Sequence, residues 1–144
     1  MIYIPKYFNI SELTPPEMGS IIKRKGDEWA FSTLFDERLL ITADFIRDMF
    51  GVMIVNDWAD GGSFRYRGFR PGDCDVGAEY SQHRFGRGLD LIPLEKSVYK
   101  IREEILNYPD SPRFKLIGGL EMNIPWLHID VRARKDGNIL LFNP

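Results

Sequence analysis

The chain has 144 residues, of which 44% are apolar and 28% charged, and its net charge is −2. This length suits one domain, residues 1–144, with a single hydrophobic core, and the apolar content argues against a disordered chain. The charge provides no basic field to favour a nucleic-acid partner, and no apolar run approaches the roughly 18 residues of a membrane span. The one cysteine, Cys74, cannot form an internal disulfide. It is either a small loop residue, a fourth metal ligand or a redox-sensitive thiol.

The first residues of the chain, 1–6, lack the basic start and long apolar middle of a signal peptide. We therefore expect a protein made in the cytoplasm and not exported by that route, and we expect a monomer. Ser11, followed by Glu12, is a candidate helix cap, and Pro15 with Pro16 interrupts any long helix there. Residues 17–35 predict no definite element.

The clearest helix is predicted from about residue 36 to residue 50. Its apolar residues recur at helical spacing, acidic Asp36 and Glu37 fall in the first turn, and Gly51 follows the end. Residues 52–56 then predict a buried strand. This helix and strand are expected to belong to the core.

Residues 57–80 form a long polar stretch with neither a helical nor a strand period. A loop of this length in a small domain is usually functional or mobile. Arg65, Arg67 and Arg70 stand beside aromatic residues in it. The stretch is either a solvated basic loop or one wall of a substrate cleft, because the planar fork of arginine matches a carboxylate.

Both histidines of the chain lie in stretches that favour a metal site. His83 is followed seven residues later by Asp90, and Gly86 and Gly88 between them allow the backbone to turn sharply. Residues 89–92 predict a buried strand, on which Asp90 points away from its apolar neighbours. With His128, these side chains form a plausible three-ligand zinc site that leaves a fourth position for water.

The stretch 126–131 predicts a second strand of the site. Its apolar residues alternate with Trp126, His128 and Asp130, which are therefore expected on one face. Taken alone, each histidine is more often structural than a ligand. Asp90 could equally end a strand or pair with Arg84 or Arg87.

Three further elements complete the prediction. Residues 95–108 indicate a helix that Pro109 ends, residues 114–119 a strand and turn, and residues 139–142 a last strand. Two substantial helices among short strands predict an α+β domain with a small antiparallel or mixed sheet and flanking helices.

Two motifs resemble those of a known family. The stretch Ser81-x-His83-x-x-Gly86-x-Gly88-x-Asp90 resembles the Ser-x-His-x-x-Gly-x-Ala-x-Asp signature of the zinc D-alanyl-D-alanine peptidases. That family includes bacterial carboxypeptidases and phage L-alanyl-D-glutamate endolysins, and it shares its fold with the hedgehog signalling domain. The ending Trp126-Leu127-His128-Ile129-Asp130 resembles the Trp-x-His-x-Asp ending of a phage-associated branch.

Weaker likenesses extend the resemblance from about residue 7 to residue 132. The stretch Arg67-Gly68-Phe69-Arg70 resembles a Ser-Gly-Tyr-Arg segment, and the stretch from Tyr7 to Leu13 resembles the start of these domains. The resemblance implies a hedgehog/DD-peptidase-like fold, Zn²⁺ held by His83, Asp90 and His128, and a peptidoglycan peptide as partner. It also makes Arg70 the best candidate for binding a substrate carboxylate, with Ser81 assisting and Arg67 next in line.

The catalytic base departs from the family pattern. The family commonly has an acid three residues before its last histidine, where this chain has Pro125. Asp130, two residues beyond His128 on the same strand face, is the preferred replacement, and Glu121, in the turn before the strand, is the second choice. Asp130 could instead orient a ligand through a hydrogen bond.

Three classes of function remain. The first is a zinc peptidase that cuts peptidoglycan stem peptides, a phage-type wall enzyme that reaches the wall after release or as part of a phage particle. The second is a non-catalytic, zinc-stabilised domain that binds a wall peptide or protein. The third is a metal-free interaction module, which would require both histidines to be accidental.

Overall fold

In the computed structural model, which describes residues 1–144, five strands form one mixed sheet in the order β1-β2-β4-β3-β5. The α+β class is therefore confirmed. Neighbouring strands are antiparallel except for β3 and β5, which are parallel. The strands are β1 (Met53–Ile54), β2 (Gly88–Pro93), β3 (Gly119–Glu121), β4 (Leu127–Asp130) and β5 (Leu140–Phe142).

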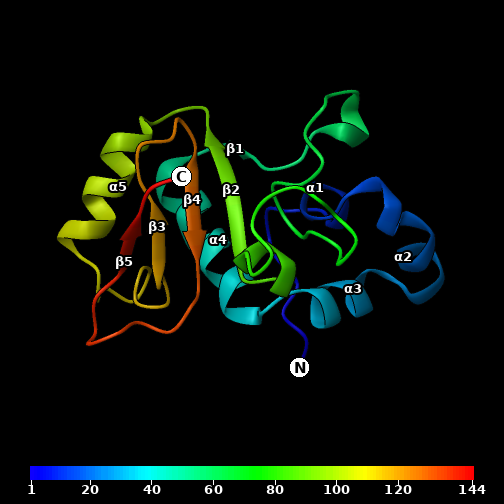
Figure 1. The fold of residues 1–144 in the computed structure, drawn as a ribbon, viewed down its shortest axis with the longest axis horizontal. Coiled ribbons are helices and arrows are strands. Elements are labelled where there is room, and N and C mark those ends of the chain that lie inside the picture. The colour runs from blue at the N-terminus through cyan, green and yellow to red at the C-terminus, as the bar shows by residue number, and fades with distance from the viewer.

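The structure has five α-helices, and Figure 1 shows α2 and α3 at the end of the molecule away from β3 and β5. The helices are α1 (Ile10–Leu13), α2 (Gly19–Lys25), α3 (Asp27–Leu34), α4 (Glu37–Phe50) and α5 (Val98–Asn107). Short 3-10 turns add η1 (Pro16–Met18), η2 (Trp58–Asp60) and η3 (Gln82–Phe85). No helix combines the length and the apolar character that crossing a membrane requires.

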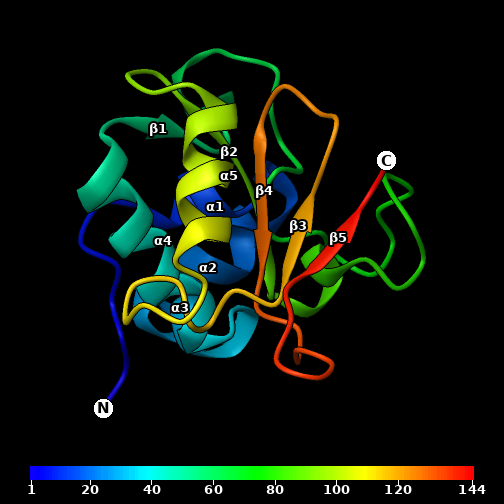
Figure 2. The same ribbon diagram turned by 90° about the vertical axis from the view of Figure 1, so that its left-hand side faces the viewer.

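One face of the central strands packs against α4 and α5, as the side view in Figure 2 helps to follow. Alternate residues of β2 and β4, such as Leu89 and Ile129, join the apolar residues of these helices in one core cluster of 21 buried residues. The residues between them, including Asp90 and His128, must then lie on the opposite face of the sheet. The fold therefore separates the core from the polar groups on the same two strands.

The long helix α4 confirms its prediction. The Asp36 side chain accepts a hydrogen bond from the Arg38 backbone N–H at its start, and Gly51 ends it with φ of 88°. The prediction for α5 is confirmed over residues 98–107, with Ser97 as its cap. Residues 57–80 form a loop that holds only the short turn η2, as expected.

Four local predictions need correction. Asn9, not Ser11, caps α1, because its N–H donates to the Glu12 carboxylate at 2.8 Å. The strand expected over residues 52–56 is only the two-residue β1. Residues 114–116 lie in turns, and β3 begins only at Gly119. The apolar side chains of Phe114 and Ile117, which suggested a strand, are buried in the core from this irregular stretch. Residues 17–35, which predicted no element, contain α2 and α3.

Candidate metal centre

His83, Asp90 and His128 come together as predicted. Asp90 on β2 is directly opposite His128 on β4 in the sheet register, and His83 lies in η3, just before β2. The Asp90 Oδ1 atom is 3.3 Å from His83 Nε2 and 2.8 Å from His128 Nδ1. One ligand atom from each residue lies within 4.8 Å of the others, so this buried group could hold a metal ion.

The turn that brings His83 to the sheet depends on Gly86. This residue has φ of 66°, and a Cβ there would lie 1.8 Å from the Leu34 carbonyl oxygen. Only glycine combines the left-handed backbone with such a close approach. The prediction that a glycine between His83 and Asp90 makes the sharp turn is therefore confirmed at this position.

Each histidine is oriented by a partner on its other ring nitrogen. His83 Nδ1 lies 2.8 Å from the Gly68 carbonyl oxygen, which can only accept, so this nitrogen carries the proton and Nε2 presents its lone pair to the cluster. His128 Nε2 lies 3.0 Å from Asp130 Oδ2, so Nε2 donates there and Nδ1 faces the cluster. Such partners are typical of metal-ligating histidines, so the donor set fits a metal.

Burial and hydrogen bonding affect the two histidines differently. Burial lowers the pKa of His83 below its ordinary value, although Asp90 opposes this. Burial also disfavours the charged form of His128, but the hydrogen bonds to Asp130 and Asp90 outweigh it and raise the pKa of His128 to about 9. Burial raises the pKa of Asp90, but this is outweighed by the interactions with His128, which donates a hydrogen bond to it, and with His83, and together they hold its pKa well below the usual range.

Asp130 does not reach the open side of the cluster. Its side chain is fully buried, and Arg132 donates to both carboxylate oxygens, from Nε to Oδ1 at 2.8 Å and from Nη2 to Oδ2 at 2.6 Å. Against the effect of burial, hydrogen bonds from His128 and Arg132 lower the pKa of Asp130. Its prediction as a base that approaches a reacting water does not match this placement, whereas its alternative role, orienting His128, does.

A cavity of about 630 Å³ opens beside the cluster. All three candidate ligands line it, as do Arg70, Ser81 and Glu121, but Asp130 and Arg67 do not. The remaining walls come from the loop before η3, from η3 itself, from residues on either side of β4 and from the C-terminal end: Gly77, Ala78, Glu79, Tyr80, Gln82, Trp126, Arg132, Phe142, Asn143 and Pro144. The structure thus brings together three of the five predicted catalytic and substrate-binding residues.

The Arg70 guanidinium is held at the edge of the cluster by three partners. Its Nε donates to the Tyr66 carbonyl at 2.8 Å, its Nη1 to Ser81 Oγ at 3.3 Å, and its Nη2 lies 3.6 Å from Asp90 Oδ2. Burial lowers the pKa of Arg70 from its ordinary value, although arginine still keeps its charge at neutral pH. This cation faces the cavity close to the candidate ligands.

Arg67 lies outside the cavity and has a structural role. Its guanidinium carbon is 3.9 Å from the centre of the Phe64 ring and 5.1 Å from that of Trp126. Its carbonyl oxygen accepts a hydrogen bond from the Asp90 N–H at 2.8 Å. Its prediction as a substrate-binding residue therefore does not match its position, because the side chain is stacked between aromatic rings.

Glu121 is the last residue of β3 and not part of a turn, which corrects its predicted location. Its Oε2 atom lies 4.0 Å from His128 Nδ1, and its side chain lines the cavity. Glu121 makes no hydrogen bond to another side chain, in contrast to the doubly bonded Asp130. Its carboxylate is therefore available on the open side of the cluster.

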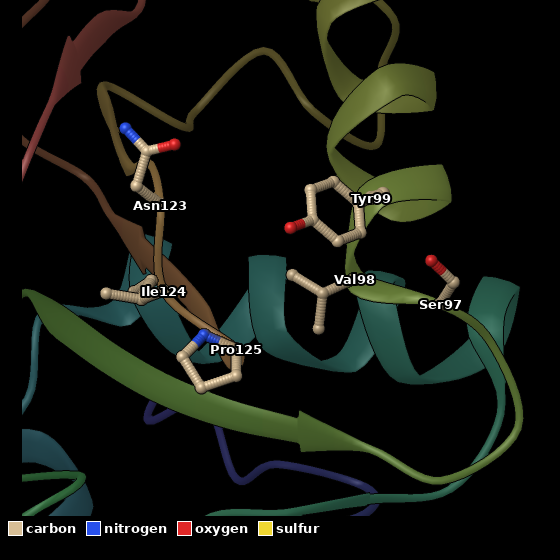
Figure 3. Close-up of a pocket in the computed structure, with 6 residues that line it drawn as sticks. All are labelled: Ser97, Val98, Tyr99, Asn123, Ile124 and Pro125. Carbon is tan, nitrogen blue, oxygen red and sulfur yellow. The ribbon is translucent and has the colours of Figure 1, made fainter.

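Pro125 lies in a different hollow, shown in Figure 3, between the start of α5 and the loop that joins β3 to β4. This hollow is lined by Ser97, Val98, Tyr99, Asn123, Ile124 and Pro125 and contains no carboxylate, imidazole or thiol. The position where the resembling family has an acid thus does not line the metal cavity in this chain.

Two contacts of the site were not predicted. The Gly68 carbonyl orients His83 from the long loop, and the ring of Phe142 on β5 packs edge-on against His128 with 5.5 Å between the ring centres. A main-chain carbonyl leaves no pattern in the sequence, and the position of Phe142 beside His128 depends on the place of β5 in the sheet order. The pairing of Asp130 with Arg132, which lies two residues beyond the end of β4, was not predicted either.

Comparison with known proteins adds no assignment. No protein-family model matches the chain, and no curated protein or solved structure matches it either.

Proposed function

We propose that this chain is a zinc-dependent peptidase that cuts a peptide bond in the stem peptides of bacterial peptidoglycan. The observation that supports this most is the buried group of His83, Asp90 and His128, whose outer ring nitrogens are already paired and which lines a cavity beside Arg70. Three protein ligands from imidazole and carboxylate are the set that catalytic zinc uses. The likeness of the two motifs to those of zinc D-alanyl-D-alanine peptidases and phage endolysins points to the same chemistry.

Zinc, when bound, would supply Lewis acidity that polarises the scissile carbonyl and makes a water molecule more acidic. Glu121 would accept a proton from the attacking water and pass it to the leaving amine, as a general base and then a general acid. Glu121 is preferred over Asp130 because its carboxylate lines the cavity and has no guanidinium partner.

Arg70 and Ser81 would bind the substrate. A peptidoglycan stem peptide carries several carboxylates, and the guanidinium can bind one of them with two parallel hydrogen bonds. Ser81 Oγ already accepts from Arg70 Nη1 and would hold the fork in place while its own O–H donates to the peptide.

The biological setting is part of the same proposal. A wall-cutting enzyme of this kind would act as a monomer on the cell wall, after release from the cell or as part of a phage particle. Its partner would be the wall peptide.

A second candidate is a non-catalytic zinc domain that binds a wall peptide. The observation that favours it is Pro125, which replaces the acid that the family commonly has and lies outside the metal cavity. In this case zinc would stabilise the fold and no bond would be broken.

Turnover decides between the two candidates. Purified protein loaded with zinc is incubated with purified peptidoglycan, and released fragments are measured with and without a chelator. Release that the chelator abolishes and added zinc restores supports the peptidase. One zinc per chain with no release from any peptidoglycan chemotype supports the binding domain, and a protein that takes up no zinc contradicts both.

A further inference from the structure

One guanidinium, that of Arg84, binds four main-chain carbonyls of the segment 71–80. Its Nε donates to Ala78 at 3.2 Å and its Nη1 to Gly72 at 3.2 Å and to Pro71 at 3.4 Å, while its Nη2 donates to Cys74. Arg84 directly follows His83 in η3. It therefore connects the turn that carries a candidate metal ligand to the segment that forms a wall of the cavity.

The segment 71–80 has few other means of keeping its shape. It contains no helix and no strand, and all of its side chains except that of Cys74 are exposed or partly exposed. Because so little apolar surface is buried, the hydrophobic effect contributes little to its conformation. The hydrogen bonds of Arg84 are the main contacts that fix the course of this chain.

The segment in turn touches the Arg70 guanidinium at Gly77. This glycine has φ of 80°, and a Cβ there would lie only 2.4 Å from Arg70 Nη1. The main chain at Gly77 thus lies directly against the group that lines the cavity beside Asp90. Arg70 also contacts Tyr66, Ser81 and Asp90, and the segment supplies a further contact while the guanidinium still lines the cavity.

We propose that Arg84 is a positioning residue that holds the segment 71–80 against Arg70 and thereby sets the affinity of the cavity for a carboxylate. The carboxylate as substrate group rests on the proposed function, but the contact between the segment and Arg70 does not. Lysine cannot replace Arg84, because a single ammonium cannot reach four carbonyls that the planar fork of arginine binds from three nitrogens.

The first test needs no substrate. The Nε–H signal of Arg70 and the amide signal of Gly77 are followed by NMR in the full chain and in Arg84→Lys. We expect both signals to move in Arg84→Lys, and the Arg70 signal to move in Gly77→Ala as well, because the added methyl group is forced toward Arg70. The matched control is Gly72→Ala in the same segment, where a Cβ meets nothing within 4 Å. An unchanged Arg70 signal in Arg84→Lys would overturn the proposal.

The second test measures function with a zinc-loaded protein and two muropeptides, one with its free carboxylate and one with that carboxylate amidated. We expect Arg84→Lys to raise KM for the free carboxylate on the order of tenfold, the cost of a misplaced binding group, with zinc content unchanged. The amidated peptide should be affected little. In an Arg70→Ala background, Arg84→Lys should add no further loss, because the two residues act as one unit.

Two results overturn the proposal in this second test. One is an equal rise of KM for both peptides, and the other is additive loss in the double variant. Failure of the proposed function looks different: the wild-type protein cleaves neither peptide, while the NMR comparison still decides whether Arg84 positions Arg70.

Discussion

The metal-ligand cluster and the segment 71–80 face the same cavity but are held in place by different means. The three candidate ligands are at most 6% exposed and lie on paired strands or on the turn that Gly86 closes. The segment is largely exposed and depends on one arginine. A buried, paired site resists change, whereas a polar loop is easily displaced. We therefore expect metal affinity and substrate affinity to respond to different substitutions.

The largest effect should follow loss of a ligand. His83→Ala or His128→Ala removes one of three donors, so we expect stoichiometric zinc binding to disappear and thermal stability to fall. Each kcal/mol lost would lower Tm by roughly 2–8 °C for a domain of this size. Metal analysis and calorimetry check this, with Arg84→Lys as the variant that should keep its zinc. If both histidine variants retain one zinc per chain, the ligand assignment is wrong.

Glu121→Gln should separate catalysis from metal binding. The change removes proton affinity but keeps shape, so we expect turnover to fall by ~10²–10⁴-fold, the usual contribution of a general acid–base group, with zinc retained. Rates on purified peptidoglycan and zinc content are measured together. Full activity in this variant would mean that Glu121 is not the base.

Asp130→Asn should affect the cluster and not the chemistry directly. An amide leaves the Arg132 guanidinium without its buried counter-charge and weakens the hold on His128 Nε2. We expect zinc affinity to fall by ~10–100-fold, as for other partners of metal-ligating histidines. At saturating zinc, most of the turnover should return. A variant that binds zinc normally but has no activity would instead restore Asp130 as the base.

The sequence predicted the buried metal-ligand cluster better than the exposed segment 71–80 and its contacts. Alternation along residues 89–92 and 126–131 placed Asp90 and His128 on the face opposite the core, because strand periodicity is a local property. It could not distinguish Asp130 from Glu121 as the group on the open side, because that depends on Arg132 pairing with one of them and on the position of β3 beside β4. The contacts of Arg84 and Gly77 were not predicted, because main-chain carbonyls in a loop follow no side-chain pattern.

The smallest expected effect is the release of a proton when zinc binds, and it distinguishes the two histidines of the cluster. His128, with its pKa raised to about 9, is charged at pH 7 in the metal-free protein, whereas His83, with its pKa lowered by burial, is neutral. Because a ligand nitrogen must be deprotonated, zinc binding at pH 7 should release about one proton, which comes from His128. Asp90, whose pKa is depressed, releases none.

The sign of the pH dependence follows from the raised pKa. A charged His128 stabilises the metal-free fold fully below its unfolded pKa of ~6.5, and this stability is lost as pH rises through about 9. Zinc therefore competes with protons for His128, and zinc affinity should rise roughly tenfold per pH unit between ~6.5 and 9. Titration calorimetry in two buffers of different ionisation enthalpy measures the released proton directly. If no proton is released at pH 7, His128 is already neutral in the metal-free protein. The hydrogen bonds of Asp130 and Asp90 would then orient the ring without stabilising its charged form.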